Sequence, residues 1–585
     1  MFKSISIRII TVSLFGAILL VGCSKDDAED QTVGAGILVS EASILQYVPA
    51  DSPYVIANIE PLPDALLDKF EPKFDEVLQS YDALLREIVK VAEQEAAAEG
   101  DDSADMEKVS AVVDGLSSLM SLEGMRGAGF SRDSTGVFYG VGLLPVLRVT
   151  VSDGALVDAA LTRIEEEAGE QMAVATIGDS SFRYVEADKA KILIATYEDQ
   201  VVITLVPASF DDAQVGQILG LTLPEKNIAE AGVLQRIAGE YGYTSHFVGF
   251  IDIEKIVGTF FGGASGTDVA LLDLAGDEKP ELSDVCKAEI TALAGTVPRI
   301  VMGYKAINED YMESQAVIEL RNDIAAGLAN LPAAVPGLGG DQGGLMSFGL
   351  SLDVMEARNF YEARLDALEA DPFECEEFAE FQAGIAASRA ALQQPVPPMV
   401  YDFKGFLTVI NDIEGLDLAT NTPPTSVDGR VLLAMDNAPA LLALGAMFSP
   451  ELAGLSIEPD GKPVPFQLPQ SQPVLESVHV ALTDEAVAMS FGAGAEQELD
   501  GMLSADTGEA GTFMSFSMDA SRYYAFIGEA MMLAEQDEEN PMPPEFQAAL
   551  NDIMVTFSDF YDRMSADIRF TERGIEIDST ITLKD

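Results

Sequence analysis

The stretch Met514-Ser-Phe-Ser-Met-Asp-Ala-Ser-Arg-Tyr-Tyr-Ala-Phe-Ile-Gly-Glu-Ala-Met-Met532 changes its hydrophobic period at Asp519. Apolar residues alternate before this aspartate, and they recur at intervals of three and four after it, as at Tyr523, Phe526 and Ile527. A period of two is typical of a strand and a period of 3.6 of a helix. The stretch therefore predicts a strand that runs directly into a helix, with the Asp519 carboxylate accepting hydrogen bonds from the free N–H groups of the first helical turn.

The same change of period occurs at five other places, which lie 83 to 101 residues apart along the chain. These junctions are Asn58, Asp153, Asp252, Asp353 and Asp436. Turn residues after each junction, such as Thr571-Glu-Arg-Gly574 after Asp519, indicate a hairpin after each helix. We therefore predict an α+β fold with mostly antiparallel sheets, helices packed on one face, and six β-α-β-β units in tandem. The alternative is six unrelated strand–helix junctions in an α+β protein.

The N-terminus has the pattern of an export signal. Lys3 and Arg8 precede an apolar run over 9–20 that is too short to cross a bilayer as a helix. The following Leu20-Val-Gly-Cys23 resembles the lipobox of bacterial lipoproteins. This resemblance implies that 1–22 is a signal peptide and that Cys23 becomes the diacylated first residue of the mature protein. The alternative is an ordinary secretory signal with a chance cysteine.

The residues after Cys23 bear on where such a lipoprotein is sent. In the lipoprotein family an aspartate at the next position would suggest retention in the inner membrane, whereas this chain has Ser24. The resemblance therefore implies an outer-membrane protein that faces the periplasm. Ser24-Lys-Asp-Asp27 also resembles the export signal of surface lipoproteins, so a location on the cell surface is the alternative. Residues 23–42 are polar and acidic and are expected to form a flexible tether.

The body of the chain divides into three expected α+β regions. These are 43–240, which holds two units and a helical insertion at 63–121, then 241–425, and finally 426–585. Pro49-Ala-Asp-Ser-Pro53, at the start of the body, resembles a segment of uncharacterised bacterial envelope proteins. That resemblance implies a location in the envelope and no particular activity.

The cysteines indicate one disulfide. If Cys23 is acylated, only Cys286 and Cys375 remain, and an even pair in an oxidising compartment favours a bridge. It would close a loop of about 90 residues and stabilise the fold by roughly 4 kcal/mol in the chain-entropy model. Two buried free thiols are the alternative, because the sequence does not show whether the two residues are close.

The charge of the chain excludes some partners. The formal net charge is −63, which repels phosphate backbones and argues against nucleic-acid binding. The same charge opposes peripheral attraction to anionic lipid surfaces and favours cationic partners. A hydrophobic content of 48% excludes a disordered chain in spite of this charge.

Motifs that carry catalysis are missing from the sequence. His246 and His479 are the only histidines, and both fall in expected strands, where a structural role is favoured. The glycine-rich segments 263–266 and 337–344 have neither nucleophile-elbow nor phosphate-loop spacing, so they are read as loops. We therefore expect no catalytic residue, no cofactor and no metal site.

The carboxylates do not single out a site. Two acidic clusters are candidate calcium ligands but do not match an EF-hand loop, so a solvated acidic face is the preferred interpretation. They are Asp101, Asp102 and Asp105, and Asp537, Glu538 and Glu539. The junction aspartates, which one can imagine as a ring of ligands, are better explained as helix caps worth about 1 kcal/mol each.

These observations favour a lipid-anchored envelope protein without enzymatic activity, which binds a protein or a hydrophobic ligand or has a structural role. The alternative is an envelope hydrolase that uses carboxylates we cannot identify. A pair of acids in a cleft, one with a raised pKa, would favour the enzyme. A long apolar groove would favour the carriage of a lipid or peptide.

Overall fold

The computed structural model describes most of the body of the chain. The described residues are 44–99, 115, 117–169, 171–187, 189–262, 268–269, 271, 282–415, 424–467, 475, 477–525 and 544–584. The predicted signal peptide, Cys23, the tether over 23–42 and both acidic clusters lie outside them.

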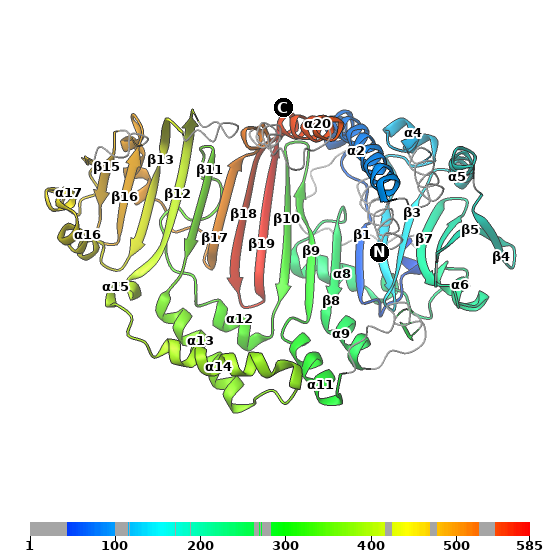
Figure 1. The fold of residues 1–585 in the computed structure, drawn as a ribbon, viewed down its shortest axis with the longest axis horizontal. Helices are drawn as coiled ribbons and strands as arrows, with labels where there is room; N and C mark the ends of the chain where they lie inside the picture. The colour runs from blue at the N-terminus through cyan, green and yellow to red at the C-terminus, as the bar shows by residue number, and fades with distance from the viewer. Residues whose placement is uncertain are drawn as a thin grey trace.

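Nineteen strands form one sheet in which every neighbouring pair is antiparallel (Figure 1). The fold is therefore α+β with a large antiparallel sheet, as predicted. The strands follow one another across the sheet in the order β14 (Val464–Pro465), β15 (His479–Leu482), β16 (Ala486–Phe491), β13 (Ser426–Met435), β12 (Phe403–Glu414), β11 (Met346–Ser351), β17 (Thr512–Asp519), β18 (Tyr561–Thr571), β19 (Gly574–Leu583), β10 (Tyr311–Glu319), β9 (Arg299–Ile307), β8 (Val248–Asp252), β1 (Tyr54–Asn58), β2 (Gly136–Val141), β3 (Leu144–Thr150), β7 (Gln200–Pro207), β6 (Ala190–Thr196), β5 (Ser180–Ala187) and β4 (Ala173–Ile177).

The sheet consists of two halves with the same strand order. Counted outward from the centre, β10-β9-β8-β1-β2-β3-β7 in the N-terminal half corresponds to β19-β18-β17-β11-β12-β13-β16 in the C-terminal half. The halves join where β10 pairs antiparallel with β19 and Gln315 lies opposite Asp578. Equivalent strands in antiparallel contact are related by an approximate two-fold rotation.

The prediction of six β-α-β-β units in tandem is not confirmed by this topology. Four groups do consist of neighbouring strands in chain order, namely β1-β2-β3, β8-β9-β10, β11-β12-β13 and β17-β18-β19. The junctions at Asp153 and Asp436 instead follow β3 and β13, strands that already belong to a group. The chain then returns to pair with these same strands through β7 and β16.

The prediction that the helices cover one face is not confirmed either, because helices gather at both ends of the strands (Figure 1). At one end α2 (Asp64–Glu99) packs against α20 (Pro544–Phe560). At the other end lie α11 (Asp284–Ala294), α12 (Asn322–Leu328), α13 (Val354–Ala370) and α14 (Ala379–Leu392). Each group brings together helices from both halves of the sheet: α2 with α20 at one end, and α11 with α13 and α14 at the other.

The remaining helices complete the layers. They are η1 (Ile44–Tyr47), α4 (Leu122–Gly127), α5 (Gly154–Ala168), α6 (Asp212–Ile218), α7 (Ile228–Ala231), α8 (Val233–Tyr241), α9 (Ile253–Gly262), η2 (Glu376–Phe378), α15 (Pro398–Tyr401), α16 (Ala438–Phe448), α17 (Pro450–Ala453), η3 (Ala495–Glu498) and α18 (Leu499–Leu503).

The two largest cores lie on the same side of the sheet, which we call the covered face. In the N-terminal half η1 and α6 to α8 pack on it, with Leu45, Ile218 and Leu234 buried against Val55 and its neighbours. In the C-terminal half the segment 331–344 and α18 do the same. On the opposite side α5 and α16 pack only near the two outer flanks of the sheet.

The predicted helix caps are formed at four of the five junction aspartates. The carboxylates of Asp153, Asp252, Asp353 and Asp519 each accept a hydrogen bond from a backbone N–H in the first turn of the helix that follows. At Asp436 the prediction is wrong by one residue, because the Asn437 side chain caps α16. Asn58, for which no cap is predicted, lies five residues before the start of α2, and its amide donates to the His246 carbonyl.

Candidate functional site

Strands β11 and β17 turn serines toward the covered face and large apolar side chains away from it. Ser347 and Ser517 are buried, whereas the alternate residues Met346 and Phe348 are 37% and 38% exposed. Soluble proteins usually bury apolar side chains and expose polar ones in such strands. The inversion marks the open side of these two strands as a candidate functional surface.

Three of the buried serines, Ser347, Ser351 and Ser517, are held by hydrogen bonds on the covered face, whereas the hydroxyl of the buried Ser515 has no hydrogen-bond partner among the described residues. The Ser347 and Ser517 hydroxyls lie 2.8 Å apart, and Ser351 donates to the Thr512 carbonyl at 2.6 Å. The segment 331–344 closes this side, since Leu338 leaves no room for a Cβ at Gly349 of β11. The polar side of these strands is thus filled from within the chain.

The inverted surface continues over eight neighbouring strands. We define the apolar face as the side chains of β8, β9, β10, β19, β18, β17, β11 and β12 that point away from the covered face. By register and alternation they are Gly249, Ile251, Ile300, Met302, Tyr304, Met312, Ser314, Ala316, Ile318, Ile575, Ile577, Ser579, Ile581, Met564, Ala566, Ile568, Phe570, Met514, Phe516, Met518, Met346, Phe348, Leu350, Phe406, Thr408 and Ile410.

None of these side chains is charged, and all of these residues except Gly249 are partly exposed, up to 38% at Phe348. The polar atoms of the apolar face are limited to the hydroxyls of Tyr304, Ser314, Ser579 and Thr408. Lys404, at a bulge of β12, points its ammonium to the strand end, where it bonds Asp353 at 2.8 Å and Asp436 at 3.2 Å.

The apolar face is large and bounded. Eight strands at a spacing of about 4.8 Å span roughly 34 Å. At one end of the strands it is roofed by Leu66 of α2 and Phe560 of α20, which pack with Met312 and Ile581. Contiguous apolar surface of this size on a protein marks a binding site or an interface more often than a plain outer surface.

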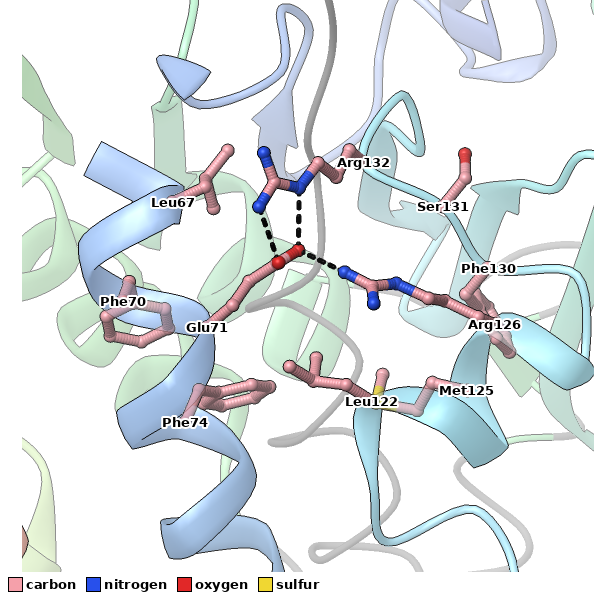
Figure 2. Close-up of a pocket in the computed structure, with 10 residues that line it drawn as sticks. All are labelled: Leu67, Phe70, Glu71, Phe74, Leu122, Met125, Arg126, Phe130, Ser131 and Arg132. Carbon is pink, nitrogen blue, oxygen red and sulfur yellow. Dashed lines mark hydrogen bonds and ion pairs between the residues drawn. The ribbon is translucent and has the colours of Figure 1, made fainter. Parts of the chain in front are cut away.

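A second candidate lies between α2 and α4, where Glu71 sits among aromatic and aliphatic side chains (Figure 2). Its carboxylate accepts two hydrogen bonds from Arg132, at 2.8 and 2.5 Å, and one from Arg126 at 2.7 Å. The hydrogen bond from Arg132 holds the Glu71 pKa below its usual value. A carboxylate kept ionised in this way is unsuited to act as a general acid, so the cluster serves to fasten α4 to α2.

Cys286 and Cys375 are joined by a disulfide between α11 and the residue before η2. The bridge therefore links the helical insertion after β8 to the one after β11, across the two halves of the sheet. A Glu377 oxygen is close enough to complete a possible set of metal ligands with both sulfurs. Metal binding requires thiolates, and in the disulfide neither sulfur is one, so the group is a covalent clasp.

The seam between β10 and β19 holds a buried polar network on the covered face. Gln315 donates to Glu576 at 3.1 Å and to Asp578 at 2.8 Å. Arg569 also bonds both carboxylates, at 3.2 and 2.5 Å. The two acids are occupied as acceptors for internal donors, and the network is not the open acid pair that an envelope hydrolase would need.

The histidines have backbone partners in the structure. His246 Nδ1 is 3.3 Å from the Glu60 carbonyl, and His479 Nδ1 is 3.1 Å from the Ser477 carbonyl. His246 lies just before β8 and not within a strand as predicted. Among the described aspartates at the junctions, each serves its own helix start or an ion pair, so the imagined ring of ligands is not formed.

The apolar face was not found from the sequence, although its signal is visible there. The alternation Met346-Ser-Phe-Gly-Leu-Ser351 was read correctly as a strand. Alternation alone does not tell which of the two sets of side chains is covered. The usual assumption places the apolar set inside, and here that assumption fails.

Neither family models, nor curated proteins, nor solved structures provide a match to this chain. Of the helices in the described residues, none combines the length and the apolar character required to cross a membrane.

Proposed function

We propose that this chain is a lipid-anchored cell-envelope protein that binds a hydrophobic ligand on the apolar face and has no enzymatic activity of its own. The observation that carries the proposal is the inversion in β11 and β17, where serines are buried while Met346 and Phe348 are exposed. Exposed apolar surface costs free energy in water, and a bound ligand would recover it.

The N-terminal pattern supports the location that we propose. Acylation of Cys23 would fix the protein to a membrane, since two or more chains give stable attachment. Ser24 favours the outer membrane, with the body facing the periplasm. A body of repeated β-α-β-β elements, extended by duplication of a whole half-sheet, would then project beyond the tether. The net charge of −63 supports the exclusion of nucleic acid from its partners.

A protein partner on the same face is the second possibility from the sequence, and the composition of the face argues against it. Protein interfaces carry about one hydrogen bond per 100–200 Å². Four hydroxyls over eight strands fall short of this density. A hydrophobic small molecule or lipid makes fewer polar demands and fits the face better.

Two experiments test the proposal: the first tests acyl anchoring at Cys23, and the second tests the binding of a hydrophobic probe. Replacing Cys23→Ala should release the protein from the membrane fraction of the producing cell, and continued retention would contradict acyl anchoring. The released protein should bind the uncharged apolar dye N-phenyl-1-naphthylamine.

Met346→Glu should weaken the binding of this dye, because a carboxylate would then lie within the apolar face. Val174→Glu is the matched control, since Val174 is 66% exposed on the distant edge strand β4. Equal dye binding by both variants would refute the proposed site.

A further inference from the structure

We infer that the ligand of the apolar face is a phospholipid, held by its acyl chains, whose head group carries no net negative charge. This inference rests on the proposed function and names the chemistry of the ligand. Its three supports are the uniform apolar lining, the dimensions of the face, and the distribution of charge in the chain.

The lining suits a ligand that makes no hydrogen bonds over most of its length. From β8 to β12 the apolar face offers hydroxyls only at Tyr304, Ser314, Ser579 and Thr408. A peptide or a sugar would leave polar groups without partners against such a surface, at a cost of about 1–3 kcal/mol each. Methylene chains have no such groups.

The dimensions match acyl chains. Half of a hydrocarbon core about 30 Å thick gives roughly 15 Å for one chain. The nine residues of β10 span about 30 Å, so a chain aligned with the strands fits within their length. The width of roughly 34 Å leaves room for the two chains of one lipid side by side.

Methionines make the face adaptable. The set includes six methionines on five strands: Met302 of β9, Met312 of β10, Met346 of β11, Met514 and Met518 of β17, and Met564 of β18. Unbranched thioether side chains fill irregular gaps and follow the shape of a mobile partner. A lining of this kind tolerates acyl chains of different length and saturation.

The charge of the protein selects the head group. With a formal net charge of −63 the protein repels anionic lipids over a distance set by the ionic strength. Lys404 stands on β12 beside the apolar face, and Asp353 and Asp436 already neutralise it. A zwitterionic head group avoids this repulsion.

The test uses the full chain with Cys23→Ala, so that its own lipid does not interfere. The protein is mixed with vesicles of phosphatidylcholine or of phosphatidylglycerol, each with a trace of radiolabelled lipid, and is separated from them by gel filtration. We expect the protein to carry label from phosphatidylcholine and about tenfold less from phosphatidylglycerol at low salt. Added salt should narrow that ratio because it screens the repulsion.

Two variants make the result specific to the apolar face. Phe348→Glu and Met346→Glu should each reduce the label by about tenfold, because they place a charge against methylene groups. Val174→Glu should leave it unchanged. Thermal unfolding of each variant shows whether it is folded, and two substitutions are used so that the test survives if one of them fails to fold.

The outcomes separate this inference from the proposed function. Dye binding that is sensitive to Met346→Glu, without transfer of either lipid, would overturn the phospholipid and leave a different hydrophobic ligand. Equal uptake of both lipids would overturn the selection by head-group charge. If the folded Cys23→Ala protein binds neither the dye nor either lipid, the apolar face is not a binding site and the proposed function is overturned as well.

Discussion

Glu71→Gln is the sharpest test of the packing between α2 and α4. The substitution keeps the shape of the side chain and removes the charge that Arg132 and Arg126 share. Hydrogen bonds to a charged group contribute about 1.5–3 kcal/mol, and partial exposure of both arginines lowers the figure. We therefore expect the free energy of unfolding to fall by about 2 kcal/mol.

The two arginines should contribute unequally. Arg132 makes two parallel bonds to the carboxylate and its side chain is 31% exposed, whereas Arg126 makes one and is 51% exposed. Urea denaturation of Glu71→Gln, of each arginine-to-glutamine variant and of the two double variants gives both coupling energies. We expect about 1–2 kcal/mol for the pair with Arg132 and below about 0.5 kcal/mol for the pair with Arg126.

The pH dependence follows from the lowered pKa of Glu71. A carboxyl with a lower pKa in the folded state than in the unfolded state adds stability above the unfolded value, about 4.3, and loses it as the pH falls through the folded value. The difference in stability between wild type and Glu71→Gln should thus be constant near neutrality and shrink below about pH 4. Equal couplings for both arginines, or a difference that grows in acid, would refute this account.

Two further predictions concern the clasp and the helix caps. Replacing both Cys286 and Cys375 with serine opens a loop whose ends are 89 residues apart. We expect the free energy of unfolding, measured by urea denaturation, to fall by up to about 4–5 kcal/mol. A fall of less than about 1 kcal/mol would mean that packing between the helices holds α11 and η2 together without the disulfide. Asp353→Ala should lower the free energy of unfolding by about 1–2 kcal/mol, because it removes a helix cap and a partner of Lys404. Asn437→Ala, which removes the cap of α16, should lower it by about 1 kcal/mol, and Asp436→Ala should lower it by less than either. The reverse ranking of Asp436 and Asn437 in the same assay would show that the caps are misassigned.

Local structure could be predicted well where a single residue decides it. The carboxylates at Asp153, Asp353 and Asp519 mark strand–helix junctions because a short acceptor is needed at that point. The prediction failed at Asp436, where the next residue, Asn437, offers an equally short acceptor. Two neighbouring candidates cannot be ranked without the backbone dihedral angles.

The long-range arrangement could not be predicted from periodicity. The central pairing sets Gln315 opposite Asp578, and a pairing between strands so far apart in sequence leaves no local trace. The disulfide is of the same kind, since the approach of Cys286 to Cys375 depends on how two helical insertions meet. An even cysteine count favours a bridge without showing that its partners are close.

The inverted strands show why the site itself escaped sequence reasoning. In β11 the serines and the large apolar residues alternate with the same period whichever set is covered, so the pattern does not indicate which set is buried. The segment 331–344 decides this, because it packs on the serine side through Leu338 and makes that side the interior.

That choice carries a cost for stability. Hydroxyl groups such as those of Ser347 and Ser517 need internal partners once they are buried, and they find them in each other. The same segment leaves Met346 and Phe348 in water, although exchanging the two sets would bury the apolar residues. Departures of this kind from consistent patterning are expected at functional surfaces, and a ligand that covers the apolar face would remove the cost that the fold incurs by leaving it open.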